Sequence, residues 1–112
     1  MTMTMTMQMN LTHNITHKDL VKQCLGYLSL LPNSCFRKML GGLGMRGFLD
    51  LEGCYKGRFY AFEIKTGTGK LSECQKARIE AIRKAGGVAL ELRCIEQLHE
   101  VFKSENPQIE LF

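Results

Sequence analysis

The chain has 112 residues and a formal net charge of +4 at neutral pH. This length allows one small domain and leaves no room for a second hydrophobic core. No segment is apolar for long enough to span a membrane and none has the pattern of a signal peptide, so we expect a cytoplasmic protein. Five cysteines, odd in number and without a C-x-x-C pair, favour reduced and mostly buried thiols over a disulfide framework or a zinc site.

The N-terminal part predicts a disordered segment followed by a helix. Residues 1–14 begin with a low-complexity Met-Thr run that we expect to be disordered, and residues 15–112 form a single domain. Thr16 is a predicted N-cap with Asp19 in the capping-box position, and apolar residues at helical spacing continue until Pro32. His13 and His17 are four residues apart, as zinc ligands on a helix can be, but they straddle the predicted cap. We therefore expect a solvated helix entry there.

The middle of the chain predicts three strands. The first runs from Cys35 to Leu40, and the glycine-rich stretch at 41–47 follows it. This stretch lacks the Lys-Ser/Thr pair of a phosphate-binding loop, which excludes a nucleotide-binding reading. Two further strands, at about Phe48 to Glu52 and Arg58 to Lys65, are joined by a predicted hairpin loop over 53–57.

The last third predicts a helix, a strand and a closing helix. Ser72 and Gln75 form a capping box that opens a helix ending at Lys84 or Ala85, before two glycines. Residues 88–93 read as a strand and 95–103 as an amphipathic helix. The order α-β-β-β-α-β-α predicts an α/β sandwich on a mixed sheet, in which the last two strands are parallel.

Three charged residues in the apolar strands point to chemistry. Side chains alternate along a strand, so Glu63 and Lys65 share one face, and the hairpin lays Asp50 beside Glu63. A buried charge is costly unless it is paired or bound to a metal. Two acids and a lysine at one place therefore suggest a divalent-cation site, while the alternative is a structural salt bridge in which Lys65 alone neutralises the acids.

The basic residues are concentrated in the centre of the chain. Between Arg37 and Lys84 the sequence has eleven basic and five acidic residues, whereas acidic residues prevail after Lys84. A basic centre suits a polyanionic substrate, because phosphate contacts dominate affinity for nucleic acids. We take Arg46, Lys70 and Lys76 as candidate DNA contacts; for the run from Lys76 to Lys84, a solvated helix face is the alternative.

The ordered set of motifs resembles the PD-(D/E)xK nuclease superfamily and, more narrowly, its VRR-NUC domain, the virus-type replication-repair nuclease module. The resemblance covers most of residues 16–103. The matching features are a glycine turn at Gly44 to Gly47, the strand acid Asp50, a hairpin at Gly53 to Gly57, Glu63-Ile64-Lys65, a glycine-containing loop at Thr66 to Lys70, and Ser72-x-x-Gln75.

Two positions depart from the family pattern. Leu49 stands where the family usually has Pro before the strand acid, which changes the backbone entry but not the chemistry. Many members also carry a Glu early in the first helix that completes the metal site, whereas this helix begins His17-Lys18-Asp19. The resemblance then implies either that Asp19 substitutes, or that the site uses Asp50, Glu63 and the Ile64 carbonyl.

The resemblance implies a restriction-endonuclease-like fold and a Mg²⁺- or Mn²⁺-dependent deoxyribonuclease. Asp50, Glu63, Lys65 and Gln75 would be its catalytic residues, and cleavage would leave a 5′-phosphate. For Gln75, a place in the capping box and a contact to an active-site water are compatible. Members made of little more than this domain come from phages or their bacterial hosts, and they resemble Holliday-junction resolvases that act as homodimers on branched DNA.

Two other readings and a dimer surface follow from the same residues. The chain can be a catalytically silent nuclease fold that binds branched DNA, or a metal-dependent structural or regulatory protein without a nucleic-acid partner. A homodimer is the simplest way to make two symmetric nicks. The apolar residues available for its interface are Leu92, Leu98, Val101, Phe102 and the tail residues Ile109, Leu111 and Phe112. Leu25, Leu28 and Leu31 on the first helix are the other candidates, but we expect the monomer core to bury them.

Overall fold

The computed structural model describes residues 15–40 and 48–103. The expected disorder of residues 1–14, the glycine-rich stretch with Arg46, and the apolar tail at 109–112 lie outside the described residues.

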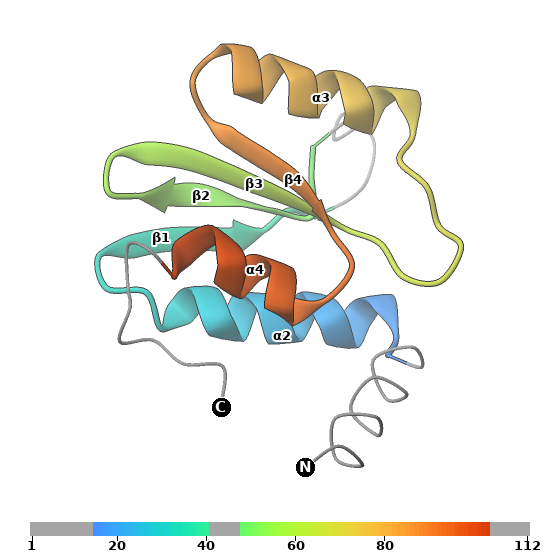
Figure 1. Ribbon diagram of the computed structural model, residues 1–112, viewed down its shortest axis with the longest axis horizontal. Helices are drawn as coiled ribbons and strands as arrows, with labels where there is room; N and C mark the ends of the chain where they lie inside the picture. The colour runs from blue at the N-terminus through green and yellow to red at the C-terminus, as the bar shows by residue number, and fades with distance from the viewer. Residues whose placement is uncertain (1–14, 41–47, 104–112) are drawn as a thin grey trace.

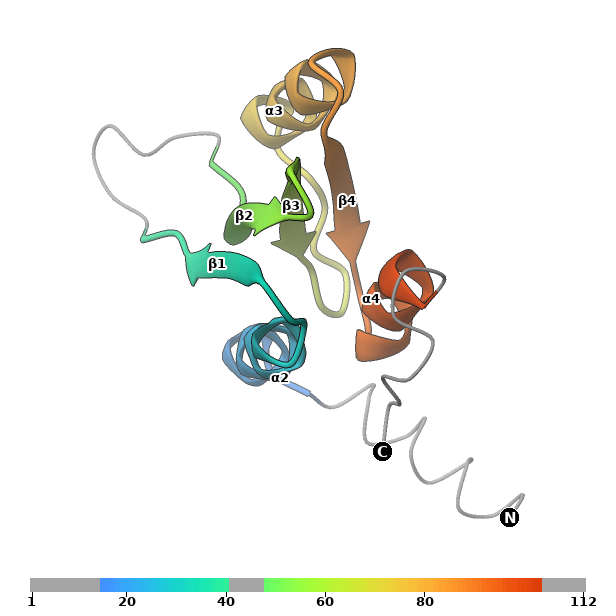
Figure 2. The same ribbon diagram turned by 90° about the vertical axis from the view of Figure 1, so that its left-hand side faces the viewer.

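The element order predicted from the sequence is confirmed. The chain forms α2 (His17–Ser29), β1 (Ser34–Lys38), β2 (Leu51–Tyr55), β3 (Arg58–Ile64), α3 (Glu73–Lys84), β4 (Val88–Leu92) and α4 (Ile95–Phe102) (Figure 1). The four-stranded sheet has the order β1-β2-β3-β4, with β4 parallel to β3 and the other pairs antiparallel. Helices α2 and α4 cover one face and α3 covers the other (Figure 2). No helix in the described part of the chain is long and apolar enough to cross a membrane.

The hairpin between β2 and β3 is tighter than predicted. Lys56 and Gly57 form a two-residue turn with φ angles of 52° and 78°, the positive values of a type I′ turn. Gly53 is therefore a strand residue and not part of a loop. A side chain there would lie 2.7 Å from the Phe36 Cα, so glycine is required for β1 to approach β2.

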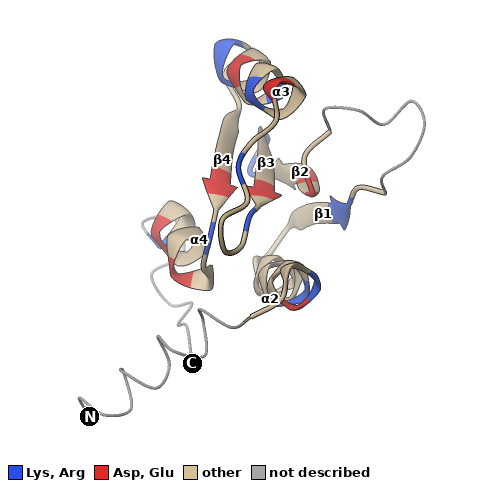
Figure 3. Cartoon of the chain, turned by 90° about the vertical axis from the view of Figure 1, so that its right-hand side faces the viewer, with Lys and Arg blue, Asp and Glu red and all other residues tan. Residues whose placement is uncertain are grey.

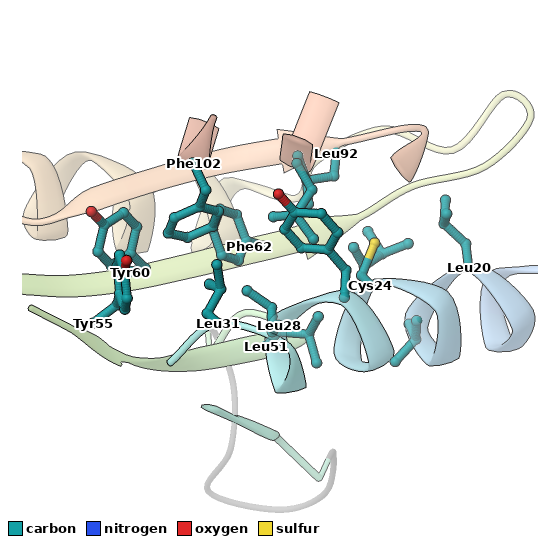
Figure 4. Close-up of a cluster of buried hydrophobic side chains, with 14 residues drawn as sticks. Leu20, Cys24, Leu28, Leu31, Leu51, Tyr55, Tyr60, Phe62, Leu92 and Phe102 are labelled. Atoms are coloured by element: carbon teal, nitrogen blue, oxygen red, sulfur yellow. The ribbon is translucent and has the colours of Figure 1, made fainter. Parts of the chain in front are cut away.

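The main core lies between the sheet and the pair α2 and α4 (Figure 4). Tyr60, Phe62 and Ile64 of β3 point into it, as their alternation predicts. Phe102 lies at its centre, with ring centroids 5.0 Å from Tyr60 and 5.6 Å from Tyr55.

This core corrects the predicted dimer surface. Leu92, Leu98 and Phe102 are fully buried within the monomer, and Val101 packs partly buried against the same core. These residues are used for packing α4 onto the sheet, so their side chains are not free to form an interface. Leu28 and Leu31 of the first-helix region are buried in the monomer core, as expected.

The cysteines are less buried than expected. Cys24 is buried in the core, but Cys35, Cys54 and Cys74 are exposed and Cys94 is intermediate. Cys35 and Cys54 are partners in the β1–β2 register, and α3 packs on β3 and β4 instead of covering them. All of these thiols are free, as predicted.

Candidate active site around Asp50 and Glu63

Asp50 lies directly before β2, one residue outside the strand. The predicted strand from Phe48 to Glu52 is thus displaced, because β2 begins at Leu51. The backbone N–H groups of Leu49 and Asp50 donate instead to two carboxylates, at 3.1 Å to Glu52 Oε2 and 3.2 Å to Glu63 Oε1. Side-chain acceptors therefore take the role of a neighbouring strand at this point, and they fix the backbone that carries Asp50.

The side chain of Asp50 turns toward the end of β3. Its Oδ2 accepts a hydrogen bond of 2.8 Å from the Ile64 N–H. The Asp50 side chain is 23% exposed, so it is held by the protein and still reached by solvent. The predicted approach of Asp50 to Glu63 is confirmed, through the Asp50 N–H and the charge that Asp50 places near Glu63.

Glu63 is buried near the end of β3, on the sheet face under α3. Its Oε2 accepts a hydrogen bond of 2.9 Å from the Gln75 amide and lies 3.4 Å from the Lys65 Nζ. Burial, and then the negative charge of Asp50, raise the pKa of Glu63 to about 7, while Lys65 acts to lower it. One lysine therefore neutralises the two acids incompletely, which is the electrostatic environment that a divalent cation would complete.

Gln75 forms the predicted capping box and also reaches the carboxylate site. It is the third residue of α3, where its backbone N–H donates to Ser72 Oγ and its Oε1 accepts from the Ser72 N–H. The side-chain amide nitrogen Nε2 takes no part in the capping box and donates a hydrogen bond to Glu63. The contact is to the carboxylate itself, so Gln75 orients Glu63 from the start of α3.

His17 is a site residue that the sequence reasoning missed. Its Nε2 lies 3.1 Å from Asp50 Oδ2, so the first turn of α2 reaches the carboxylate site. The expected solvated helix entry holds for His17, whose side chain is 49% exposed, but the contact with Asp50 was not expected. Asp19, proposed to replace the family glutamate, is exposed, and its backbone N–H caps the helix by donating to Thr16 Oγ. The sequence feature that could have indicated this contact was the position of His17 at the start of the predicted helix.

A second acid on the same face is neutralised separately. Glu91 of β4 is the register partner of Glu63, and acidic positions of β3 and β4 lie side by side in Figure 3. Arg93 pairs with Glu91 at 2.7 Å and donates to the carbonyls of Gly67 and Gly69 at 3.2 and 2.6 Å. Arg93 thereby fixes the glycine-containing loop that follows Lys65, a long-range contact that no sequence motif indicated.

A buried ion pair supports the other side of Asp50. Arg78 of α3 donates to Glu52 through Nη2 at 2.8 Å and Nε at 3.3 Å. Glu52 also holds the Leu49 N–H, and the Arg78 guanidinium lies 4.9 Å from the centre of the Phe48 ring. Helix α3 therefore positions both halves of the site, with Gln75 acting on Glu63 and Arg78 acting through Glu52.

The candidate DNA contacts are only partly described. Lys70 and Lys76 are exposed, Lys76 in a pair of 3.5 Å with Glu73, while Arg46 lies outside the described residues. Two further basic residues of this region, Arg58 and Arg83, are exposed, and their side chains donate to the carbonyls of Gly86 and Ala89.

The described residues contain no group of three His, Cys, Asp or Glu side chains arranged to hold a metal ion. Asp50 and Glu63 are two carboxylates of the kind that hard cations prefer, and further ligands would have to be backbone oxygens, water or substrate. No protein-family model matches the chain, and no curated protein is detectably similar to it.

Proposed function

We propose that this chain is a metal-dependent DNA endonuclease of the PD-(D/E)xK type, organised like a VRR-NUC domain. The observation that carries the proposal is the joining of Asp50 to Glu63 through the Asp50 N–H, with the Lys65 ammonium 3.4 Å from Glu63. The buried face of an ordinary α/β domain has no need for two acids, a lysine and a glutamine at one corner. Their convergence from four separate positions in the sequence supports a reactive site.

The residues present fit a hard divalent cation. Asp50 and Glu63 would hold Mg²⁺ or Mn²⁺ through carboxylate oxygens, and we propose the Ile64 carbonyl as a third ligand. A bound ion supplies a water of lowered pKa and stabilises the negative charge that develops on the phosphate. Asp19 is left out of this ligand set, because it is exposed and pairs with no site residue among those described.

The protein's own residues would orient the reaction. Lys65 is 19% exposed, so its ammonium can contact both Glu63 and a phosphate oxygen at the surface. It would hold the scissile phosphate or the attacking water in line. Gln75 keeps Glu63 in one orientation. Because the raised pKa leaves Glu63 partly protonated near neutrality, cation binding would release a proton from it.

Lys70 and Lys76 are the phosphate contacts that we propose on the described surface, and branched DNA such as a Holliday junction is the proposed substrate. The protein would act as a homodimer, since two symmetric nicks need two sites. It would act in the cytoplasm of a bacterial cell, encoded by a phage or by its host. Light scattering at micromolar concentration should give twice the mass of one chain; a monomer with and without DNA would leave a single-nicking enzyme.

A panel of labelled DNA structures tests the activity. Linear duplex, single strand, flap and four-way junction are incubated with the protein in Mg²⁺, in Mn²⁺ and in EDTA. We expect cleavage of a branched substrate with either ion, 5′-phosphate ends, and no cleavage in EDTA or by a Glu63→Gln protein. If purified wild-type protein cleaves none of these substrates with either ion, the proposed activity is wrong.

One observation favours a second function, a catalytically silent module that binds branched DNA. The start of α2 places a histidine and not an acid beside Asp50, so two carboxylates remain. This candidate predicts a gel shift with a four-way junction that is the same in EDTA and in Mg²⁺, without cleavage in either.

A further inference from the structure

His17 contacts the site from a separate structural element. Its Nε2 and the Oδ2 of Asp50 are 3.1 Å apart although the residues are 33 positions apart in sequence. Helix α2 is anchored under the sheet by Leu20, Val21 and Cys24, which are nearly fully buried. The helix backbone that carries the imidazole is therefore fixed beside Asp50, while the His17 side chain itself is half exposed.

The hydrogen-bonding pattern assigns a direction to this contact. A carboxylate oxygen has no hydrogen to give, so the His17 Nε2 carries the hydrogen and Asp50 Oδ2 accepts it. The same oxygen already accepts from the Ile64 N–H at 2.8 Å. Two donors on Oδ2 occupy its lone pairs and leave Oδ1 as the oxygen available to a cation.

We propose that His17 is a positioning residue, which together with the Ile64 N–H fixes Asp50 so that Oδ1 is presented to the metal. This inference rests on the proposed function, because it assumes that Asp50 binds a cation. Outer-sphere hydrogen bonds of this kind typically change metal affinity by about 10- to 100-fold. The imidazole nitrogen is then a donor to the ligand and does not itself bind the ion.

Titration of the protein with Mn²⁺, followed by the electron paramagnetic resonance signal of the free ion, tests the inference. His17→Gln keeps an N–H at a similar reach, whereas His17→Ala removes it. We expect His17→Ala to bind Mn²⁺ about tenfold more weakly or worse, and His17→Gln to stay within about threefold of wild type. Lys18→Ala, on the exposed side of the same turn, is the matched control and should bind as wild type does.

Cleavage kinetics provide a second readout. At Mn²⁺ concentrations that saturate each protein, kcat of His17→Ala should recover most of the wild-type value, since the lost contact acts on ligand orientation. A metal requirement shifted to higher concentration with kcat preserved is the expected signature of positioning.

Three results would overturn the inference. The first is that His17→Ala binds Mn²⁺ as tightly as wild type does, and the second is that His17→Gln binds it as weakly as His17→Ala does. A ¹⁴N modulation in the pulsed spectrum of bound Mn²⁺ that disappears in His17→Ala would make His17 a direct ligand. Each of these leaves the nuclease proposal intact if Asp50→Ala abolishes Mn²⁺ binding. If wild-type protein binds no Mn²⁺ or Mg²⁺, the proposed function fails, and the role of His17 fails with it.

Discussion

On the sheet face covered by α2 and α4, strand β3 presents Tyr60, Phe62 and Ile64, whereas on the α3 face it presents Ala61 and Glu63. The first face is packed with aromatic and aliphatic side chains. The second has a small apolar cluster and the buried carboxylates of the described chain, Glu52 and Glu63. One strand therefore contributes to the main apolar core on one side and carries a buried charge on the other.

The difference between the two sheet faces shows where buried charges are tolerated. Each carboxylate on the α3 face is held by a cationic side chain, Glu52 by Arg78 and Glu63 by Lys65. Among the described residues, no buried side-chain polar atom lacks a hydrogen-bond partner. The apolar face can supply the folding free energy because it carries none of these charges, so changes on the two faces should separate stability from activity.

The largest difference between the effect on DNA cleavage and the effect on stability is expected at Lys65. Lys65→Ala should abolish DNA cleavage in the labelled-substrate assay. It should lower the free energy of unfolding by about 2 kcal/mol, because the buried Glu63 carboxylate loses its cation while the Lys65 side chain itself is 19% exposed. Mn²⁺ and DNA binding should remain. Lys103→Ala, which removes an exposed partner of Glu100, is the control and should cleave normally. A Lys65→Ala protein with wild-type cleavage would return Lys65 to a purely structural salt bridge.

The opposite result is expected at Phe102. Phe102→Ala empties the centre of the apolar face and should lower the free energy of unfolding by about 3–5 kcal/mol, measured by urea denaturation. The remaining folded protein should still cleave DNA, since the site lies on the other face. Leu40→Ala, at a position that is 67% exposed, should change stability by no more than about 0.5 kcal/mol. Loss of cleavage by fully folded Phe102→Ala would show that the two faces are coupled.

Much of the fold was predictable because its signals are local. The alternation along β3 assigned Phe62 and Glu63 to opposite faces, and the Ser72–Gln75 capping box located the start of α3. The start of β2 was misplaced because the N–H groups of Leu49 and Asp50 donate to carboxylates, although the Asp50 carbonyl still accepts from the Met39 N–H just after β1. That bonding depends on side chains distant in sequence, which propensity and periodicity do not report.

Apart from Gln75, which the resemblance indicated, the site was predictable where its residues share a strand or a hairpin. Asp50, Glu63 and Lys65 are brought together by β2 and β3, whose pairing follows from the hairpin. The contact of His17 depends on how α2 packs across the sheet. Arg78 depends on a pair with the distant Glu52, and Arg93 depends on the distant carbonyls of Gly67 and Gly69. Periodicity predicts which face of a helix is buried, but it does not predict which residues the end of the helix contacts.

An intermediate effect is expected at Arg78, where the charged face also contributes stability. Arg78→Ala leaves the buried Glu52 carboxylate without its cation and should cost about 2 kcal/mol, less than a fully buried pair because the Arg78 side chain is 33% exposed. Cleavage should fall too, as Glu52 holds the Leu49 N–H beside Asp50.

The double variant Glu52→Leu with Arg78→Met separates these two effects. Replacing both charges should restore most of the stability, because no unpaired charge remains. Cleavage should stay low, since the Leu49 N–H still lacks its acceptor. If the double variant regains cleavage as well as stability, the pair stabilises the fold without positioning Asp50.

The smallest effect concerns the pH dependence of stability on the charged face. Burial and the nearby Asp50 charge raise the pKa of Glu63 from 4.5 to about 7 in the folded protein. Between these values the folded state therefore binds more protons than the unfolded state, so the stabilising contribution is complete below about pH 4.5 and is lost as pH rises through about 7. The slope for one group cannot exceed about 1.4 kcal/mol per pH unit.

Urea denaturation in EDTA at a series of pH values measures this slope. The quantity to compare is the free energy of unfolding of wild type minus that of Glu63→Gln, because the titrations of all other groups largely cancel in the difference. We expect this difference to fall from pH 5 to pH 7 and to level off above. Phe102→Ala alters the apolar face. It should lower the free energy of unfolding by a similar amount at every pH and leave its dependence on pH unchanged. If this difference does not change with pH, Lys65 fully neutralises Glu63, and the charges on the α3 face do not favour binding of a further cation.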